Sequence, residues 1–425
     1  NGFTWQEIES AIIRGISLSM SAILILLAVG ALIGTWLLSG TVPTMIYYGL
    51  QILNPDWFYV AACIMCAIVA MSIGSSWTTA ATIGVALIGI SQGLELSAPI
   101  TAGAVISGAY FGDKISPLSE TTNLAPAIAG SELFAHIRYM LWTTIPSIFT
   151  ALVIFLVLGF TEKNVVPSTA IAELNQQLQW HFSLSVFNLI PLFVLLILAI
   201  KKVPAFPAVS IGALVGAVWA YFFQQDLILQ LAEQGSDPLT ANITVIWTAL
   251  FDGVVIETSK PELNDLLSGG GMSSMLNTIW LIICALSFGA VLEHLGMLKK
   301  FVESILKAVK STGSLITSTV LTCIGTNVMT ADQYIAIVMP GRMFKEEYQR
   351  RNLDALVLSR TLEDSGTITS PLIPWNTCGA YMYSVLAVNP LEYMFFCFFN
   401  LINPVLAVIY GFIGFNIKKL IPSQS

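Results

Sequence analysis

The most constraining feature of this sequence is a set of long apolar runs that are almost free of charged residues. Each is about long enough to cross a hydrocarbon core of roughly 30 Å as a helix, and six of them are residues 16–38, 137–159, 183–200, 204–223, 276–292 and 390–415. Charged residues make up only 10% of the chain, whereas a water-soluble domain carries about a quarter. Transmembrane β-strands would give short alternating segments, which the sequence lacks. The sequence therefore predicts an all-α polytopic membrane protein.

One polar stretch lies among these apolar runs, residues 112–123, which read GDKISPLSETTN. It holds two carboxylates, Asp113 and Glu120, together with one lysine and several hydroxyl groups. Ionisable groups inside a bilayer are costly, and a functional role is their default interpretation. We therefore expect this stretch to lie at membrane depth and to carry the chemistry of the protein.

The order of features around this stretch occurs twice in the chain. In each copy a break of small residues separates two apolar legs, at Gly74 and again at Gly325, and an acid follows 39 residues later, Asp113 or Asp364. A Ser-Pro-Leu sequence and then an asparagine follow each acid. Many transporters consist of two inverted copies of one unit. We therefore predict two inverted-topology repeats.

The basic residues predict that each pair of legs forms a re-entrant hairpin. Lysines and arginines flank the second pair at both ends: Lys299, Lys300, Lys307, Lys310, Arg342, Lys345, Arg350 and Arg351. Both ends are cytoplasmic by the positive-inside rule, and legs of about a dozen residues reach roughly 18 Å, too short to cross. The first pair lacks nearby basic residues, so we expect its hairpin to enter from the outer side.

This pattern predicts three parts, two of which are repeats that each contain a hairpin tip and a broken transmembrane helix. Residues 1–160 form repeat 1, with its tip at 74–79 and its broken helix at 97–130; residues 161–271 form a linking helical pair and outer-side connections; residues 272–425 form repeat 2, with its tip at 325–330 and its broken helix at 352–388. Nothing before residue 11 matches the helical pair that precedes repeat 2. We therefore expect a further N-terminal pair in the full protein.

The broken helices predict a cation site. Non-helical backbone at membrane depth frees carbonyl groups that need partners, and Na⁺ binds carbonyl, hydroxyl and carboxylate oxygens. We predict Asp113 and Asp364 as the principal ion-binding and proton-coupling acids, joined by Glu120 and Asp332. Supporting oxygen ligands are expected from Ser75, Ser76, Thr78, Thr79, Ser116, Ser119, Thr121, Thr122, Asn123, Thr326, Asn327, Thr369, Ser370 and Asn376.

Each acid also has a plain structural alternative. Asp113 could neutralise Lys114, and Asp364 could pair with Arg360 four residues earlier on one helix face. Glu120 is either an ion ligand or the partner of Lys114, and Glu363 is either a further ligand or a partner of Arg360. Asp332 is either a ligand or the cap of the second leg, since acids fill N-cap positions well.

The motifs carry a resemblance to a known family. Gly74-Ser-Ser-Trp-Thr-Thr79, Thr-Ile-Gly at 82–84 and GAYFGDKISPLSETTN at 108–123 resemble the NhaC family of bacterial sodium/proton antiporters, within the ion-transporter superfamily. The resemblance implies Na⁺/H⁺ antiport in a bacterial inner membrane, by a multi-pass homodimer whose transport domain moves like an elevator against a fixed scaffold. Members usually carry more N-terminal sequence. Transported Na⁺ and H⁺, rather than a cofactor, are then the bound species, and the C-terminus is expected in the cytoplasm.

Two other functions compete with antiport of inorganic ions. The family also includes malate/lactate exchangers, and a dicarboxylate would need Lys114 and nearby hydroxyls as a cationic clamp. Two intramembrane aspartates are also typical of an aspartyl protease, but Gly112-Asp113 lacks the Gly-x-Gly-Asp pattern of that class and a Tyr-Asp partner. We expect a transporter, not an enzyme, and the absence of a basic patch predicts no nucleic-acid partner.

Overall fold

The computed structural model describes residues 2–162, 168–233, 235, 237–256, 264, 267–306 and 309–420. Within these ranges the regular structure is helical, apart from two isolated backbone bridges. The prediction of an all-helical chain is therefore confirmed.

Several helices are long and apolar enough to cross a membrane. In the described part of the chain five single spans meet this test: Trp5–Leu38, Pro55–Ile73, Leu133–Thr161, Ala205–Phe223 and Met272–His294. Two helix pairs qualify only as bent spans, Ile171–His181 with Val186–Ile200 at 83° and Pro390–Phe396 with Phe398–Ile413 at 57°. The chain thus has the helices of a polytopic membrane protein.

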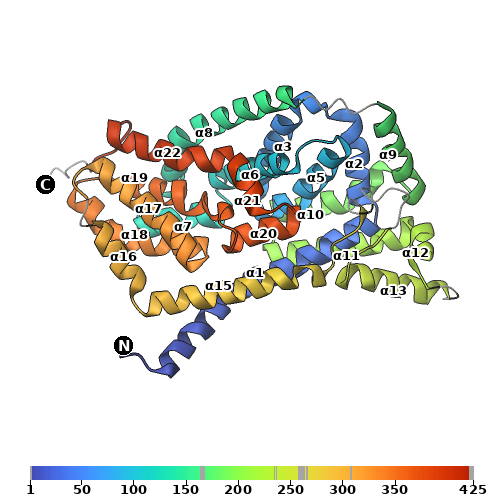
Figure 1. The fold of residues 1–425 in the computed structure, drawn as a ribbon, viewed down its shortest axis with the longest axis horizontal. Coiled ribbons are helices and arrows are strands. Elements are labelled where there is room, and N and C mark those ends of the chain that lie inside the picture. The colour runs from blue at the N-terminus through green and yellow to red at the C-terminus, as the bar shows by residue number, and fades with distance from the viewer. Residues whose placement is uncertain are drawn as a thin grey trace.

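The first half of the chain contains the longest helix of the described structure, α1, and a set of shorter helices. Its helices are α1 (Trp5–Leu38), α2 (Thr41–Ile52), α3 (Phe58–Ile73), α4 (Ser76–Thr79), α5 (Val85–Gly93), α6 (Ala98–Ile115), α7 (Glu120–Ala129), α8 (Leu133–Thr161), α9 (Ser168–His181), α10 (Ile190–Ile200), α11 (Ala205–Phe223), α12 (Gln225–Leu231) and α13 (Pro238–Phe251). A π-helical turn, η2 (Ala80–Gly84), joins α4 to α5. Helix α1 packs against α11, α13 and α15, and α3 packs against α6 (Figure 1).

The second half adds α15, helices at one end of the molecule, and α20 and α21 near its middle (Figure 1). They are α15 (Leu276–His294), α16 (Met297–Leu306), α17 (Thr312–Thr330), α18 (Gln333–Arg350), α19 (Ala355–Leu362), α20 (Thr377–Leu386), α21 (Pro390–Tyr393) and α22 (Phe398–Ile413). A π-helical turn, η5 (Glu363–Thr367), extends α19. Helix α22 packs on α8 and α17, which ties this end to the first half.

The turn between α17 and α18 lies later than the sequence predicted. Helix α17 continues through 325–330, and the chain reverses at Ala331, which has a φ of +58°, and Asp332. Gly325 is helical and packs against the Phe301 ring, which a side chain at this position would overlap. The prediction of a tip at 325–330 was therefore wrong, because glycine here permits close packing rather than a break.

Helices are interrupted close to both acids. The first interruption separates α6 from α7 at residues 116–119, and the second replaces α-helix by η5 and a short 3-10 turn, Ser370–Leu372, before α20 begins. Each interruption contains the proline of a Ser-Pro-Leu sequence, whose missing N–H and ring exclude it from a helix interior.

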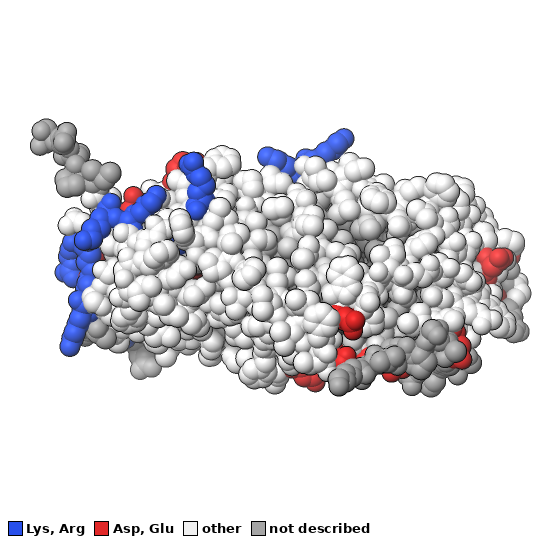
Figure 2. Space-filling view, turned by 90° about the horizontal axis from the view of Figure 1, so that it is seen from above, with Lys and Arg blue, Asp and Glu red and all other residues white. Residues whose placement is uncertain are grey.

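Charge is unevenly distributed over the surface (Figure 2). Lysines and arginines gather mainly at the end of the molecule where Figure 1 places α16 and α18, and acidic residues lie mainly at the other end and along the lower edge of Figure 2. The surface between them is almost free of charge in this view.

Candidate ion-binding site

The first site element is the turn that follows α3. Gly74 ends the helix in the left-handed region at a φ of +75°, and Ser75 then caps α4 by accepting the Thr78 N–H at 3.2 Å. A side chain at position 74 would overlap Leu118 and the Ser119 nitrogen. Glycine therefore lets this turn approach the interruption between α6 and α7.

Asp113 meets the turn from the last part of α6. Its Oδ2 accepts the Ser76 N–H at 3.1 Å and the Ser76 hydroxyl at 2.8 Å. The residue is buried, with 8% of its surface exposed. Of the described lysines and arginines, none forms an ion pair with it, and the predicted alternative of an Asp113–Lys114 pair is wrong.

Side chains satisfy the carbonyl groups that the interruption frees. The Thr122 hydroxyl donates to the carbonyl oxygens of Asp113 at 3.3 Å and Lys114 at 2.9 Å. The Asn123 amide donates to the carbonyl oxygens of Pro117 and Ser119. Thr122 and Asn123, which the sequence predicted as ion ligands, thus hold the interrupted helix together in this structure.

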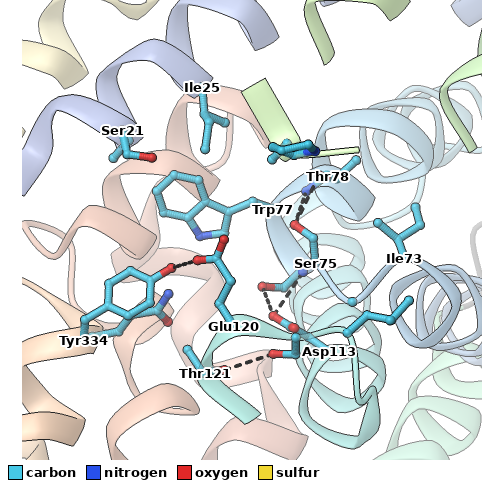
Figure 3. A pocket seen from close by; sticks show the side chains of 18 of the residues that line it. Ser21, Ile25, Ile73, Ser75, Trp77, Thr78, Asp113, Glu120, Thr121 and Tyr334 are labelled. Carbon is cyan, nitrogen blue, oxygen red and sulfur yellow. Dashed lines mark hydrogen bonds between the residues drawn. The ribbon is translucent and has the colours of Figure 1, made fainter. Parts of the chain in front are cut away.

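A cavity of about 510 Å³ opens beside Asp113 (Figure 3). Its walls come from the first turn, the interruption, the second turn and the middle of α1. The predicted residues that line it are Ser75, Ser76, Thr78, Asp113, Ser119, Glu120, Thr121 and Asp332. Its other polar or aromatic residues include Ser19, Ser21, Trp77, Lys202, Gln333 and Tyr334. Thr79 and Ser116 lie nearby in the chain but do not line the cavity.

Two further carboxylates of the cavity bond within the protein. Glu120 accepts a hydrogen bond from the Tyr334 hydroxyl, which joins α7 to α18 (Figure 3). It does not pair with Lys114, so that alternative was wrong. Asp332 caps α18 by accepting the Ile335 N–H at 3.0 Å, so the structure shows the N-cap contact that the sequence offered as its structural alternative.

Asp364 lies outside the cavity and is fully buried. It forms an ion pair with Lys114 and accepts the Thr143 hydroxyl at 3.1 Å. Lys114 is equally buried and also donates to Asn403 Oδ1 at 2.6 Å. The Arg360 Nε, the predicted partner of Asp364, lies farther away at 3.8 Å from Oδ2. The two predicted aspartates therefore do not face one common cavity.

The remaining predicted residues of the second copy form a buried network that closes its own interruption. The Asn327 amide donates to the Gly366 carbonyl oxygen at 2.6 Å, and the Asn376 amide donates to Asn327 Oδ1 at 3.0 Å. Hydroxyls of Thr369 and Ser370 donate to the Ser365 and Thr367 carbonyl oxygens. Thr326 is buried close to this network in the chain, and its hydroxyl has no hydrogen-bond partner in the described structure. None of these residues lines the cavity.

Sequence reasoning missed several residues of this region. Trp77 and Tyr334 supply the aromatic wall of the cavity, and Ser19 and Ser21 of α1 supply part of the far wall. Glu363 was weighed only as a secondary candidate, although it is fully buried. The sequence signal that could have found Glu363 is its position directly before Asp364 and directly after a Ser-Arg-Thr-Leu sequence.

Comparison with known proteins places the chain in a family. A family model described as the Na⁺/H⁺ antiporter family matches residues 108–415. The chain belongs to this family. The antiporter family resemblance drawn from the Gly108–Asn123 motif is thereby confirmed.

Curated members of the antiporter family align over nearly the whole chain. The Na⁺/H⁺ antiporter NhaC of Alkalihalophilus pseudofirmus is 39% identical over 98% of this chain and 87% of its own length. The malate-2H⁺/Na⁺-lactate antiporter of Bacillus subtilis is 38% identical over 97% of this chain and 85% of its own. Among solved structures, the YdaH transporter of Alcanivorax borkumensis aligns at 13% identity and a TM-score of 0.44, covering 96% of this chain and 89% of its own.

Proposed function

We propose that this member of the antiporter family exchanges Na⁺ for H⁺ and that the two ions compete for the carboxylate of Asp113. The observation that carries the proposal is the position of Asp113: buried, bonded by the N–H and hydroxyl of Ser76, and open to the cavity. A carboxylate in such a place binds either a proton or a cation, because a bare charge at membrane depth is costly. Alternate occupancy by the two ions suffices for exchange.

Neighbouring oxygens complete the proposed Na⁺ site. Hydroxyls of Ser75, Thr78, Ser119 and Thr121 line the same cavity, and hard cations select oxygen ligands. Glu120 and Asp332 add negative charge to the wall, which favours a cation in the cavity over an anion. We propose Asp113 as the ligand that also carries the proton, with Glu120 and Asp332 as electrostatic support and Asp364 as the counter-ion of Lys114.

The finer architecture is also a proposal. We propose that residues 1–160 and 272–425 are inverted repeats, because a helix, a turn, a second helix and an interrupted helix follow in the same order in both. In this arrangement α1 belongs to a fixed scaffold of a homodimer, and the turns and interrupted helices move past it in a bacterial inner membrane. Its support is that α1 lines the cavity opposite Asp113 (Figure 3).

A second candidate is a Na⁺/H⁺-coupled exchanger of organic anions such as malate or lactate. The cavity favours it by size, since about 510 Å³ falls within the range of organic-ligand pockets. Against it, the cationic clamp that such a substrate needs is not provided by Lys114, which is buried against Asp364. Lys202 is the lysine that lines the cavity among the described residues, and it is exposed.

The test is transport by the purified protein in proteoliposomes with a pH-sensitive dye inside. An imposed Na⁺ gradient should move protons in the opposite direction, and the Na⁺ concentration for half-maximal rate should fall as the pH rises, because fewer protons compete. Asp113→Asn should abolish exchange, while Asp226→Asn, an acid in α12 away from the cavity, should leave it unchanged. Proton movement that requires malate or lactate would select the second candidate, and an inert wild-type protein would reject both.

A further inference from the structure

Glu363 is a buried carboxylate that the proposed exchange at Asp113 does not use. It opens the π-helical turn η5, and π-helical turns frequently occur at functional sites. Its side chain is fully buried, and neither carboxylate oxygen has a hydrogen-bond partner in the described structure. The hydroxyl groups of Thr121 and Thr367 lie beside it without reaching hydrogen-bond geometry. The Thr367 hydroxyl also lacks any partner among the described residues.

Neither of the two buried cations nearby donates a hydrogen bond to Glu363 in the described structure. The Lys114 ammonium, though close enough to Glu363 to attract it, bonds to Asp364 and Asn403. The Arg360 guanidinium lies over the Tyr139 ring, 4.7 Å from its centroid, and its Nε is 3.8 Å from Asp364 Oδ2. None of its nitrogens has a hydrogen-bond partner in the described structure. Neither cation provides the hydrogen bonds that a buried carboxylate requires.

The charges of this region favour a bound cation. Asp113, Glu363 and Asp364 are three acids, and Lys114 and Arg360 are two bases, all of them buried. With every group ionised these five residues have one negative charge in excess, and Glu120 and Asp332 add to it from the cavity wall. Uncompensated charge in a buried site costs several kcal/mol, so a bound cation offsets part of this excess.

Thr121 connects Glu363 to the cavity. This residue lines the cavity next to Asp113 and also adjoins the Glu363 carboxylate. Asp113 and Glu363 are themselves close enough to repel each other. Thr121 therefore joins the cavity beside Asp113 to a second set of oxygens.

We propose that the Glu363 carboxylate and the hydroxyls of Thr121 and Thr367 form an inner Na⁺ position, which shares a single transported ion with Asp113. This inference rests on the proposed Na⁺/H⁺ exchange and assigns the deeper half of its site. The ligands are a carboxylate and hydroxyls, the oxygen types that hard cations select. In this arrangement one Na⁺ per chain serves both carboxylates.

The test measures Na⁺ binding by the purified full chain, through the rise in unfolding temperature with NaCl against choline chloride and through ²²Na⁺ binding. Wild type should bind one Na⁺ per chain. Glu363→Gln keeps the shape and removes the charge, so it should unfold no earlier than wild type without Na⁺ and bind Na⁺ at least tenfold more weakly. Thr121→Val and Thr367→Val should each weaken Na⁺ binding several-fold with Glu363 intact.

Thr35→Val is the matched control. Thr35 is a fully buried threonine of α1 whose hydroxyl, among the described residues, bonds only to carbonyl oxygens of its own helix. Its replacement should leave the Na⁺ affinity unchanged. If Glu363→Gln does not fold, the two valine variants decide the question.

The outcomes separate the inner position from the exchange itself. A wild-type protein that moves no protons in response to Na⁺ rejects the proposed function and the inner position with it. Normal exchange by wild type, together with wild-type Na⁺ affinity in Glu363→Gln or in both valine variants, rejects the inner position alone. Two Na⁺ ions per chain would reject the sharing of one ion.

Discussion

Lys114 and Asp364 illustrate how much a single buried contact can decide. Both side chains are inaccessible to solvent, and the pair joins α6 of the first half to the segment that follows α19 in the second. Removing one partner of such a pair leaves an unpaired charge, which costs about 3–5 kcal/mol, whereas replacing both partners is often nearly neutral. The pair therefore fixes the positions of the two interrupted helices relative to each other.

A double-mutant comparison tests this role. Lys114→Met should lower the unfolding temperature of the detergent-solubilised protein sharply, and Lys114→Met/Asp364→Asn should recover much of the loss, because the carboxylate that lost its partner is removed as well. Lys299→Met is the control, since Lys299 is 74% exposed and 3.9 Å from Glu303, a type of pair that contributes about 0–1 kcal/mol. Equal stability of Lys114→Met and wild type would show that the buried pair is dispensable.

At the scale of elements, the approach of the first turn to the α6–α7 interruption shapes the site. Gly74 has a φ of +75°, and a side chain there would overlap Leu118. Gly296 has a similar φ of +70°, but nothing lies within 4 Å of the position that its side chain would take. The two glycines thus share backbone strain and differ only in steric contact.

Alanine at the two glycines separates these effects. Gly296→Ala should cost about 1–2 kcal/mol from the left-handed backbone alone and leave the affinity for Na⁺ unchanged. Gly74→Ala should cost more and also weaken Na⁺ binding, because the clash moves Ser76 away from Asp113. Unfolding temperature and Na⁺ titration of both variants measure the difference, and equal effects on Na⁺ binding would contradict the close approach.

The sequence predicted the elements better than the contacts between them. Apolar runs and Ser-Pro-Leu breaks located the spans and the interruption near Asp113, because length, hydropathy and proline act locally. The turn at Ala331 was missed because the packing of Gly325 on Phe301 comes from a helix about two dozen residues earlier in the chain. Likewise no local pattern shows that Lys114 reaches Asp364, 250 residues away, rather than its neighbour Asp113.

The residues of the site likewise divide into those that the sequence could predict and those that it could not. Asp113 and the hydroxyls near it could be predicted, since they lie in one polar stretch and its adjoining turn. Tyr334 and the serines of α1 could not, since they reach the cavity only through the packing of distant helices. Thr122 and Asn123 were predicted as ligands because the freed carbonyls needed partners, and the structure supplies those partners from within the chain.

For the whole molecule, the separation of charge in Figure 2 predicts how the protein lies in a membrane. Basic residues favour the cytoplasmic side, so the end with α16, α18 and the C-terminus should face the cytoplasm. Asp56 lies at the base of the first helix pair, and Arg350 ends the second pair. If the repeats are inverted, these two positions lie on opposite sides of the membrane.

Single cysteines can measure this arrangement with a membrane-impermeant maleimide. Five of the six native cysteines are buried and Cys284 is exposed. Cys284→Ser therefore removes the accessible native thiol and keeps background labelling low. Asp56→Cys should then be labelled in intact cells, and Arg350→Cys, at a side chain that is 76% exposed, only after the cells are made permeable. Labelling of both positions from one side would reject the inverted arrangement. Labelling of Arg350→Cys in intact cells and of Asp56→Cys only in permeable cells would support the inversion but reverse the orientation that the basic residues predict.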